Sequence, residues 1–124
     1  MTERITAAEF KAGETPRKYR NEPVTVLGIR FDSKREANRW LVLCQMERDG
    51  EIRDLRRQVP IMLQGRDGPM MSRTGRQMRL TVDFSYVERK TGLTIYEDAK
   101  GKPTRDYEVR RAAAAAQGIE VLES

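Results

Sequence analysis

The chain has 124 residues, enough for one globular domain of ordinary size, and 35% of them are charged against 38% hydrophobic. The net charge is +5, which favours a polyanionic partner such as nucleic acid; a basic domain without such a partner is the plain alternative. The chain contains no histidine and one cysteine, Cys44, which excludes histidine-dependent hydrolases, imidazole zinc sites, internal disulfides and cysteine-rich zinc modules.

No segment of the sequence has the pattern of a membrane span or a signal peptide. The apolar runs are far shorter than the roughly 20 residues that cross a bilayer. The first ten residues, MTERITAAEF, lack the hydrophobic stretch of a secretory signal. We therefore expect a cytoplasmic protein that has no membrane partner.

The amino-terminal half predicts an arm, a strand and a helix. Residues 1–22 are polar and carry a basic cluster, so we expect an arm ahead of a single domain over residues 23–124. Residues 24–31 predict one short strand. Ser33 and Glu36 form a capping-box pattern, which predicts a helix that begins there and ends near Gly50. The expected core-facing stripe of this helix comprises Ala37, Trp40, Leu41, Cys44 and, less regularly, Leu43.

The remaining elements follow from alternation and turn residues. Residues 52–63 predict an extended segment containing one strand, broken by Pro60, and residues 65–77 predict a basic loop. Residues 78–87 and 93–100 alternate between apolar and polar side chains, so they predict a hairpin joined by residues 89–92. Thr104 predicts the start of a helix that ends at Gly118, before a last short strand. The fold class is therefore α/β, with helices packed against a mixed sheet.

Acidic residues occupy unusual positions on the predicted hairpin. With a four-residue turn at 89–92, Asp83 stands directly opposite Asp98, and paired side chains lie about 5 Å apart on one face. Lys100 follows two residues later on the same face. Two carboxylates this close need a cation, a shared proton or full solvation. A register slip of one residue would break the pairing and leave Glu97 as an alternative ligand.

This cluster suits a hard divalent ion such as Mg²⁺ or Mn²⁺, which binds carboxylate and water oxygens. A metal held there would stabilise the charge of a phosphodiester under attack, and Lys100 would orient the attacking water. The plain alternative is a solvated ion pair between Asp98 and Lys100, which contributes little.

Asp83 followed by Asp98-Ala99-Lys100 resembles the metal-site signature of the PD-(D/E)XK, or restriction-endonuclease-like, nuclease superfamily. A longer match covers roughly residues 18–122. It comprises KYRNEPVTVLGIRFDSKREANRW, Gly50-Glu51-Ile52 leading into DLRRQ, VDFSYV, and YEDAKG before a basic helix. These stretches look like a phage-encoded family of uncharacterised proteins assigned to that superfamily, which would place the chain in a bacterial host cell.

The resemblance implies an αβββαβ core and a set of site residues. Asp83 and Asp98 would be metal ligands, the Ala99 carbonyl a third ligand and Lys100 the catalytic lysine. Glu36 matches a first-helix glutamate that assists the metal in many members, although its capping role explains it equally well. Gln58 matches a recurrent glutamine whose role stays open.

Function and partners follow as expectations. The favoured hypothesis is a magnesium-dependent endonuclease acting on DNA, on branched, single-stranded or end structures. The alternatives are a non-catalytic nucleic-acid-binding accessory protein of phage recombination or replication, and a structural protein without DNA binding. A homodimer would suit cleavage of both strands. The residues expected to bind nucleic acid are Lys34, Arg35, Arg73, Arg76, Tyr107 and Arg110.

Overall fold

The computed structural model describes residues 22–99 and 103–124. The chain divides into two compact units, residues 1–37 and 38–124, and the boundary falls inside the first helix. The predicted division into an arm over 1–22 and a domain over 23–124 stays a prediction, because residues 1–21 lie outside the described part.

The first unit contains a hairpin where one strand was predicted. Strand β1 (Val24–Val26) pairs antiparallel with β2 (Ile29–Phe31). Leu27 and Gly28 form the turn, and both have positive φ values of 52° and 80°. Two successive residues with positive φ are typical of a tight hairpin turn, which reverses the chain. The expectation of one continuous strand was therefore wrong.

Helix α1 (Lys34–Arg48) begins and ends as the sequence predicts. The amide of Glu36 donates a hydrogen bond of 3.1 Å to Ser33 Oγ, which confirms Ser33 as the capping residue. Gly50, with a φ of 80°, follows the last turn. The predicted stripe needs one correction: Leu43 is fully buried, whereas Leu41 is exposed because it lies to one side of the face that packs.

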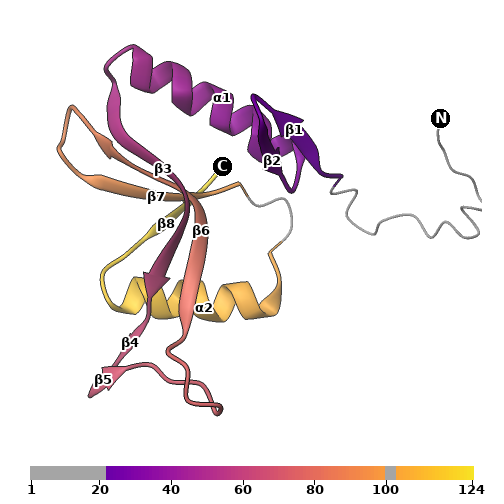
Figure 1. Cartoon of the computed structure of the whole chain (residues 1–124). Coiled ribbons are helices and arrows are strands. Elements are labelled where there is room, and N and C mark those ends of the chain that lie inside the picture. Colours follow the sequence, from indigo (N-terminus) through magenta and orange to yellow (C-terminus); the bar gives the residue numbers. More distant parts are fainter. Residues whose placement is uncertain (1–21, 100–102) are drawn as a thin grey trace, which may run out of the picture. The chain divides into compact units, whose positions relative to one another are not determined.

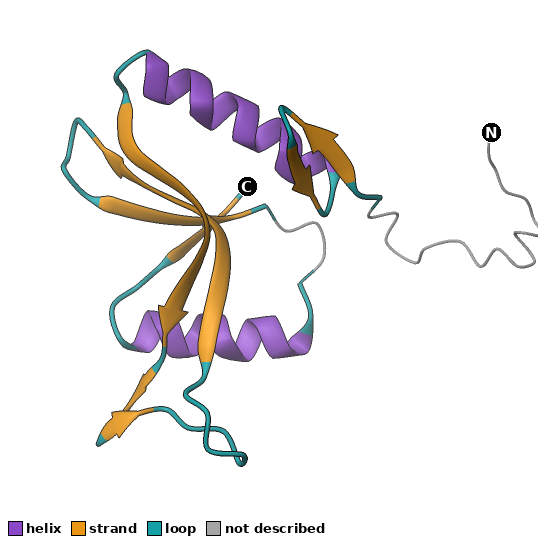
Figure 2. Ribbon diagram, viewed as in Figure 1, coloured by secondary structure: helices purple, strands orange, loops and turns teal. Residues whose placement is uncertain are grey.

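The second unit is organised by a four-stranded mixed sheet in the order β3-β6-β7-β8. Strand β6 (Arg79–Glu88) is antiparallel to both of its neighbours, β3 (Ile52–Met62) and β7 (Thr94–Asp98), and β8 (Val121–Glu123) is parallel to β7. Figure 2 shows that β3 and β6 are long and strongly twisted. Pro60 is accommodated within β3 because this strand lies at the edge of the sheet.

The predicted hairpin and its turn are confirmed. Strand β6 pairs with β7 from Phe84–Glu97 to Val87–Thr94, and the amide of Glu88 donates to the Leu93 carbonyl at 2.9 Å. The turn therefore spans residues 89–92, as expected. The basic segment 65–77, predicted as a loop, instead contributes to a small hairpin of β4 (Gln64–Gly65) and β5 (Gly68–Pro69), which forms around a two-residue turn.

Helix α2 (Arg105–Ala116) lies alongside β6 and β8 (Figure 1). Thr104 caps it by accepting the Tyr107 amide at 3.1 Å, and Gly118, with a φ of 94°, follows its end. Two apolar clusters make up the core. One contains Ile61, Leu63, Leu80, Val82, Tyr107 and Ala114; the other contains Leu43, Ile52, Phe84, Tyr86 and Ala99.

Apart from the small hairpins, the elements follow the order α1, β3, β6, β7, α2, β8. The protein is therefore of mixed α/β class, as predicted. Trp40 stacks on Phe84 with ring centroids 6.0 Å apart, which confirms its predicted core position. Among the described residues, no helix is long and apolar enough to cross a membrane.

Candidate active site

Two aspartates meet where the ladder between the central strands ends. The last paired residues of β6 and β7 are Phe84 and Glu97. The same register, continued by one residue, sets Asp83 opposite Asp98. The structure therefore confirms the pairing predicted from the length of the hairpin turn.

Crossed hydrogen bonds join these two strands through the aspartates. The amide of Asp83 donates to Asp98 Oδ1 at 2.9 Å, and the amide of Ala99 donates to Asp83 Oδ2 at 2.9 Å. Asp98 is only 1% exposed, while Asp83 is half-buried. Each strand therefore donates a backbone amide to the aspartate of the other, and the two bonds fix the positions of both side chains.

A tyrosine and a third acid lie beside this pair. In the parallel register of β7 and β8, Asp98 is the partner of Glu123. The Tyr107 hydroxyl, which comes from α2, donates to Glu123 Oε2 at 3.1 Å. Burial, together with the carboxylates of Asp98 and Glu123, raises the pKa of Tyr107 above its usual range. Tyr107 therefore stays a neutral hydroxyl donor among acids at every ordinary pH.

Gln58 lies on the other side of Asp83. Its neighbours Arg57 and Val59 pair with Phe84 and Val82, so Gln58 faces Asp83 across the β3–β6 ladder. Its Nε2 is 3.5 Å from Asp83 Oδ1, and its φ is 51°. A left-handed conformation within a strand costs about 1–2 kcal/mol for a residue other than glycine. Such strain is often found at functional sites.

Glu97, the alternative ligand, has a different environment from its neighbour Asp98. Its buried carboxylate accepts hydrogen bonds from Arg39 Nε at 2.5 Å, Arg39 Nη2 at 3.0 Å and the Tyr86 hydroxyl at 2.7 Å. Burial alone would raise the pKa of Glu97, but hydrogen bonds from Arg39, Tyr86 and Ser124 outweigh it and lower the pKa. Burial and Glu97 raise the pKa of Tyr86 to about 12. The negative charge of Glu97 is thus compensated by Arg39. The register of β6 and β7 is the predicted one, so the shift that would make Glu97 a ligand does not occur.

The donor set at the aspartates fits a hard divalent ion of low protein coordination. Asp83 and Asp98 supply carboxylate oxygens, and Asp83 forms no ion pair with another described residue. Mg²⁺ commonly binds through one or two carboxylates, with water and phosphate oxygens completing the shell. No group of three or more acidic or cysteine side chains with metal-binding geometry occurs within residues 22–99 and 103–124.

Three other predicted site residues are Lys100, Ala99 and Glu36. Lys100 lies outside the described residues, so its role stays a prediction. Ala99 contacts Asp83 through its amide, and a role for its carbonyl also stays a prediction. The Glu36 amide donates to the capping residue Ser33 within the first unit, and assistance of the Glu36 side chain to a metal stays a prediction.

The predicted nucleic-acid contacts are spread over the chain. Lys34 and Arg35 are exposed in the first unit, and Arg73 is exposed in the loop before β6. Arg76 and Arg110, in contrast, line the same hollow in the second unit. The structure places Tyr107 in the core beside the aspartates, 6% exposed, rather than on the surface.

Sequence reasoning missed Glu123 as a neighbour of the pair. A last strand was expected near residues 119–122, but the parallel pairing that brings Glu123 to Asp98 depends on the path of α2. No local pattern in the sequence carries that information. Only a general preference for a helix to connect parallel strands could have suggested it.

A model of the family described as "Protein of unknown function (DUF1064)" matches residues 16–122. The match covers every element from β1 to the middle of β8, including both aspartates. No curated protein matches the chain, and no solved structure matches it either.

Proposed function

We propose, for a chain that belongs to this family of unknown function, that it is a metal-dependent endonuclease hydrolysing phosphodiester bonds in DNA. The observation that carries the proposal is the Asp83–Asp98 pair. The two carboxylates lie on neighbouring strands, each accepts a backbone amide from the other strand, and one of them is buried. Such a pair favours a divalent cation because two adjacent carboxylates repel each other.

The order of elements supports the finer assignment of the fold. The sequence α1, β3, β6, β7, α2, β8 has the αβββαβ order of the restriction-endonuclease-like core, and the sheet is mixed. Asp83 and Asp98 also stand on the second and third strands of that order. We therefore include membership of the PD-(D/E)XK superfamily in the proposal.

Each site residue has a defined task in this reaction. Asp83 and Asp98 would hold Mg²⁺ or Mn²⁺, and that ion would supply Lewis-acid stabilisation of the charge that develops on the phosphodiester. Tyr107 keeps its hydroxyl proton and holds Glu123 beside Asp98. Lys100, two residues after Asp98, is assigned to orient the attacking water.

The proposed substrate is DNA with branched, single-stranded or end structures, because no described element reads as a base-recognition module. The net charge of +5 supports a polyanionic substrate. The proposed setting is phage DNA processing in the cytoplasm of a bacterial host. Cleavage of both strands would be served by a homodimer.

The test is a cleavage assay on linear, single-stranded, flapped and four-way DNA with and without Mg²⁺. Asp98→Asn keeps the oxygen that accepts the Asp83 amide but removes the charge, so the variant should fold and should lose cleavage by about 10³-fold or more. Asp67→Asn is the matched control, because Asp67 is 90% exposed in the turn between β4 and β5. Full cleavage by Asp98→Asn would contradict the assignment.

One observation favours a second function, a non-catalytic nucleic-acid-binding accessory protein. The described residues hold no cluster of three metal-binding side chains, so the metal affinity of the protein alone is expected to be low. In this case DNA binding would persist in all variants, and no DNA substrate would be cut with Mg²⁺ or Mn²⁺.

A further inference from the structure

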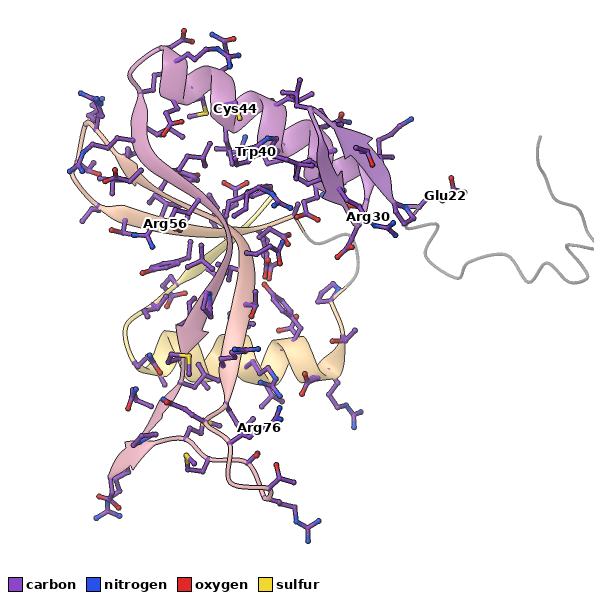
Figure 3. The ribbon with its side chains drawn as sticks, in the orientation of Figure 1. Glu22, Arg30, Trp40, Cys44, Arg56 and Arg76 are labelled. Carbon is purple, nitrogen blue, oxygen red and sulfur yellow. The ribbon has the colours of Figure 1, made fainter. Side chains whose placement is uncertain are left out.

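A second polar feature lies in the same unit as the aspartates, at the end of the sheet where β6 begins. It is a hollow of about 310 Å³ lined by Ser72, Arg76, Gln77, Met78, Arg79 and Arg110. Figure 3 shows Arg76 in the part of the second unit that carries the β4–β5 hairpin. Three of the six lining residues are arginines, and none is acidic.

The loop side of the hollow is held by a compact turn. The Ser72 amide donates to the Arg76 carbonyl at 2.8 Å, and the Arg76 amide donates to Ser72 Oγ at 3.3 Å. The Gly75 amide donates to the Ser72 carbonyl at 3.1 Å. These bonds fix the backbone from which the Arg76 side chain leaves.

The helix side is held just as firmly. Arg110 Nη1 donates to the Arg79 carbonyl at 2.6 Å, and Arg110 Nε donates to Asp106 at 2.9 Å. The guanidinium of Arg110 is therefore oriented against the start of β6 before any ligand binds. A preoriented guanidinium loses less entropy when it binds an oxyanion.

The charge balance separates this hollow from the larger one near the hairpin turn. That hollow, of about 560 Å³, has three cations in its lining, Arg39, Arg89 and Lys90, together with the acids Glu51 and Glu88. In the smaller hollow, neither Arg76 nor Arg79 forms an ion pair with another residue in the described part of the chain. Within residues 22–99 and 103–124, the one ion pair of its three arginines joins Arg110 to Asp106.

We infer that the hollow lined by Arg76, Arg79 and Arg110 binds one phosphate group of a polynucleotide backbone. Guanidinium groups match phosphate oxygens through paired N–H donors, and Ser72 adds a hydroxyl. Arg79 and Asp83 stand on the same strand, four residues apart, which corresponds to about 13 Å. One bound polynucleotide chain can therefore reach both the hollow and Asp83, and the hollow holds one of its phosphates. This inference rests on the proposed function for its ligand, and its test does not depend on cleavage.

The experiment measures binding of a labelled single-stranded oligonucleotide by fluorescence anisotropy in EDTA over a range of salt concentrations. Arg76→Gln/Arg79→Gln removes the two cations that form no ion pair with a described residue and keeps the Arg79 carbonyl that binds Arg110. Arg66→Gln is the control, because Arg66 lies in the nearby turn and is 94% exposed. The double variant should bind the oligonucleotide about tenfold more weakly at low salt. Its plot of log affinity against log salt should be shallower, with a slope smaller in magnitude by about 1–2. The control should change binding less than about twofold.

Equal losses in the double variant and the control would overturn the inference. A second measurement identifies the source of the phosphate, using NMR signals of the Ser72 and Arg76 amides. Shifts of these signals with the oligonucleotide support a polynucleotide. Shifts with inorganic phosphate alone would make free phosphate the ligand and overturn this choice of ligand. A protein that binds the oligonucleotide through the hollow but never cuts DNA would support the anchor and contradict only the nuclease proposal.

Discussion

Glu97 and Asp98 are consecutive residues of one strand and both are buried, but the groups around their carboxylates differ in charge. Glu97, 0% exposed, is enclosed by the Arg39 guanidinium and the Tyr86 hydroxyl. Asp98, 1% exposed, accepts a backbone amide and stands beside two further carboxylates, those of Asp83 and Glu123. A buried acid with its own cation serves the fold. The acidic surroundings of Asp98 are the reason why the proposed function assigns a divalent cation to the Asp83–Asp98 pair.

The largest effect is expected from separating the partners of Glu97. Arg39→Ala leaves the buried carboxylate without its cation and should lower the free energy of unfolding by about 2–4 kcal/mol, since Arg39 is itself 28% exposed. Denaturant unfolding measures this loss. Arg53→Ala is the control: it breaks the exposed Arg53–Asp54 pair and should cost less than about 1 kcal/mol. Equal losses in the two variants would contradict a larger contribution of the buried Arg39–Glu97 pair to stability.

The hydrogen-bonded pair of Glu97 and Tyr86 should make stability depend on pH at both the acidic and the alkaline end. The lowered pKa of Glu97 means that its contribution is complete above its usual pKa and is lost as pH falls through the lowered value. The raised pKa of Tyr86 means that its contribution is complete below pH 10 and is lost, by about 2 kcal/mol, as pH rises from 10 to about 12. Denaturant unfolding across pH measures both limbs. In Tyr86→Phe the alkaline loss should shrink; an unchanged loss would contradict this role.

Asp98→Asn should stabilise the protein, whereas Arg39→Ala should destabilise it. Removing one of several adjacent negative charges should raise the free energy of unfolding by about 1 kcal/mol in EDTA, which corresponds to a rise in Tm of roughly 4 °C. Thermal unfolding measures it, with Asp67→Asn as the unchanged control. Addition of Mg²⁺ should raise the Tm of the natural protein and leave that of Asp98→Asn where it is. A variant strongly destabilised in EDTA would make Asp98 a structural acid like Glu97.

The smallest effect concerns the strained residue that faces Asp83. Gln58→Gly should stabilise the protein by about 0.5–1 kcal/mol, because glycine adopts a positive φ without steric cost. Asp54, with a φ of 56° in the same strand, is the matched position, and Asp54→Gly should stabilise less because it also removes the exposed pair with Arg53. Cleavage should fall only in Gln58→Gly. Equal cleavage by both variants would assign Gln58 to strand geometry alone.

Local patterns in the sequence predicted the central part of the site. A four-residue turn fixes the register of β6 and β7, so the facing of Asp83 and Asp98 followed from counting along the chain. The helix caps at Ser33 and Thr104 were predicted for the same reason, because each depends on a few adjacent residues.

Features that depend on tertiary packing were not predicted. The choice of Leu43 over Leu41 depends on which side of α1 meets Phe84 and Ile52. The neighbourhood of Glu123 depends on how α2 returns the chain to β7. The convergence of Arg76 and Arg110 links residues far apart in sequence, so no pattern within either segment indicated it.

The central claim is that Asp83 and Asp98 bind a divalent cation. Isothermal titration calorimetry of the full chain with Mn²⁺ and Mg²⁺ tests it most directly, with Asp98→Asn and Asp67→Asn measured in parallel. We predict one weak site, in the millimolar range, that is present in the natural protein and in Asp67→Asn and is lost in Asp98→Asn. The same binding in Asp98→Asn, or none in the natural protein, would contradict the claim.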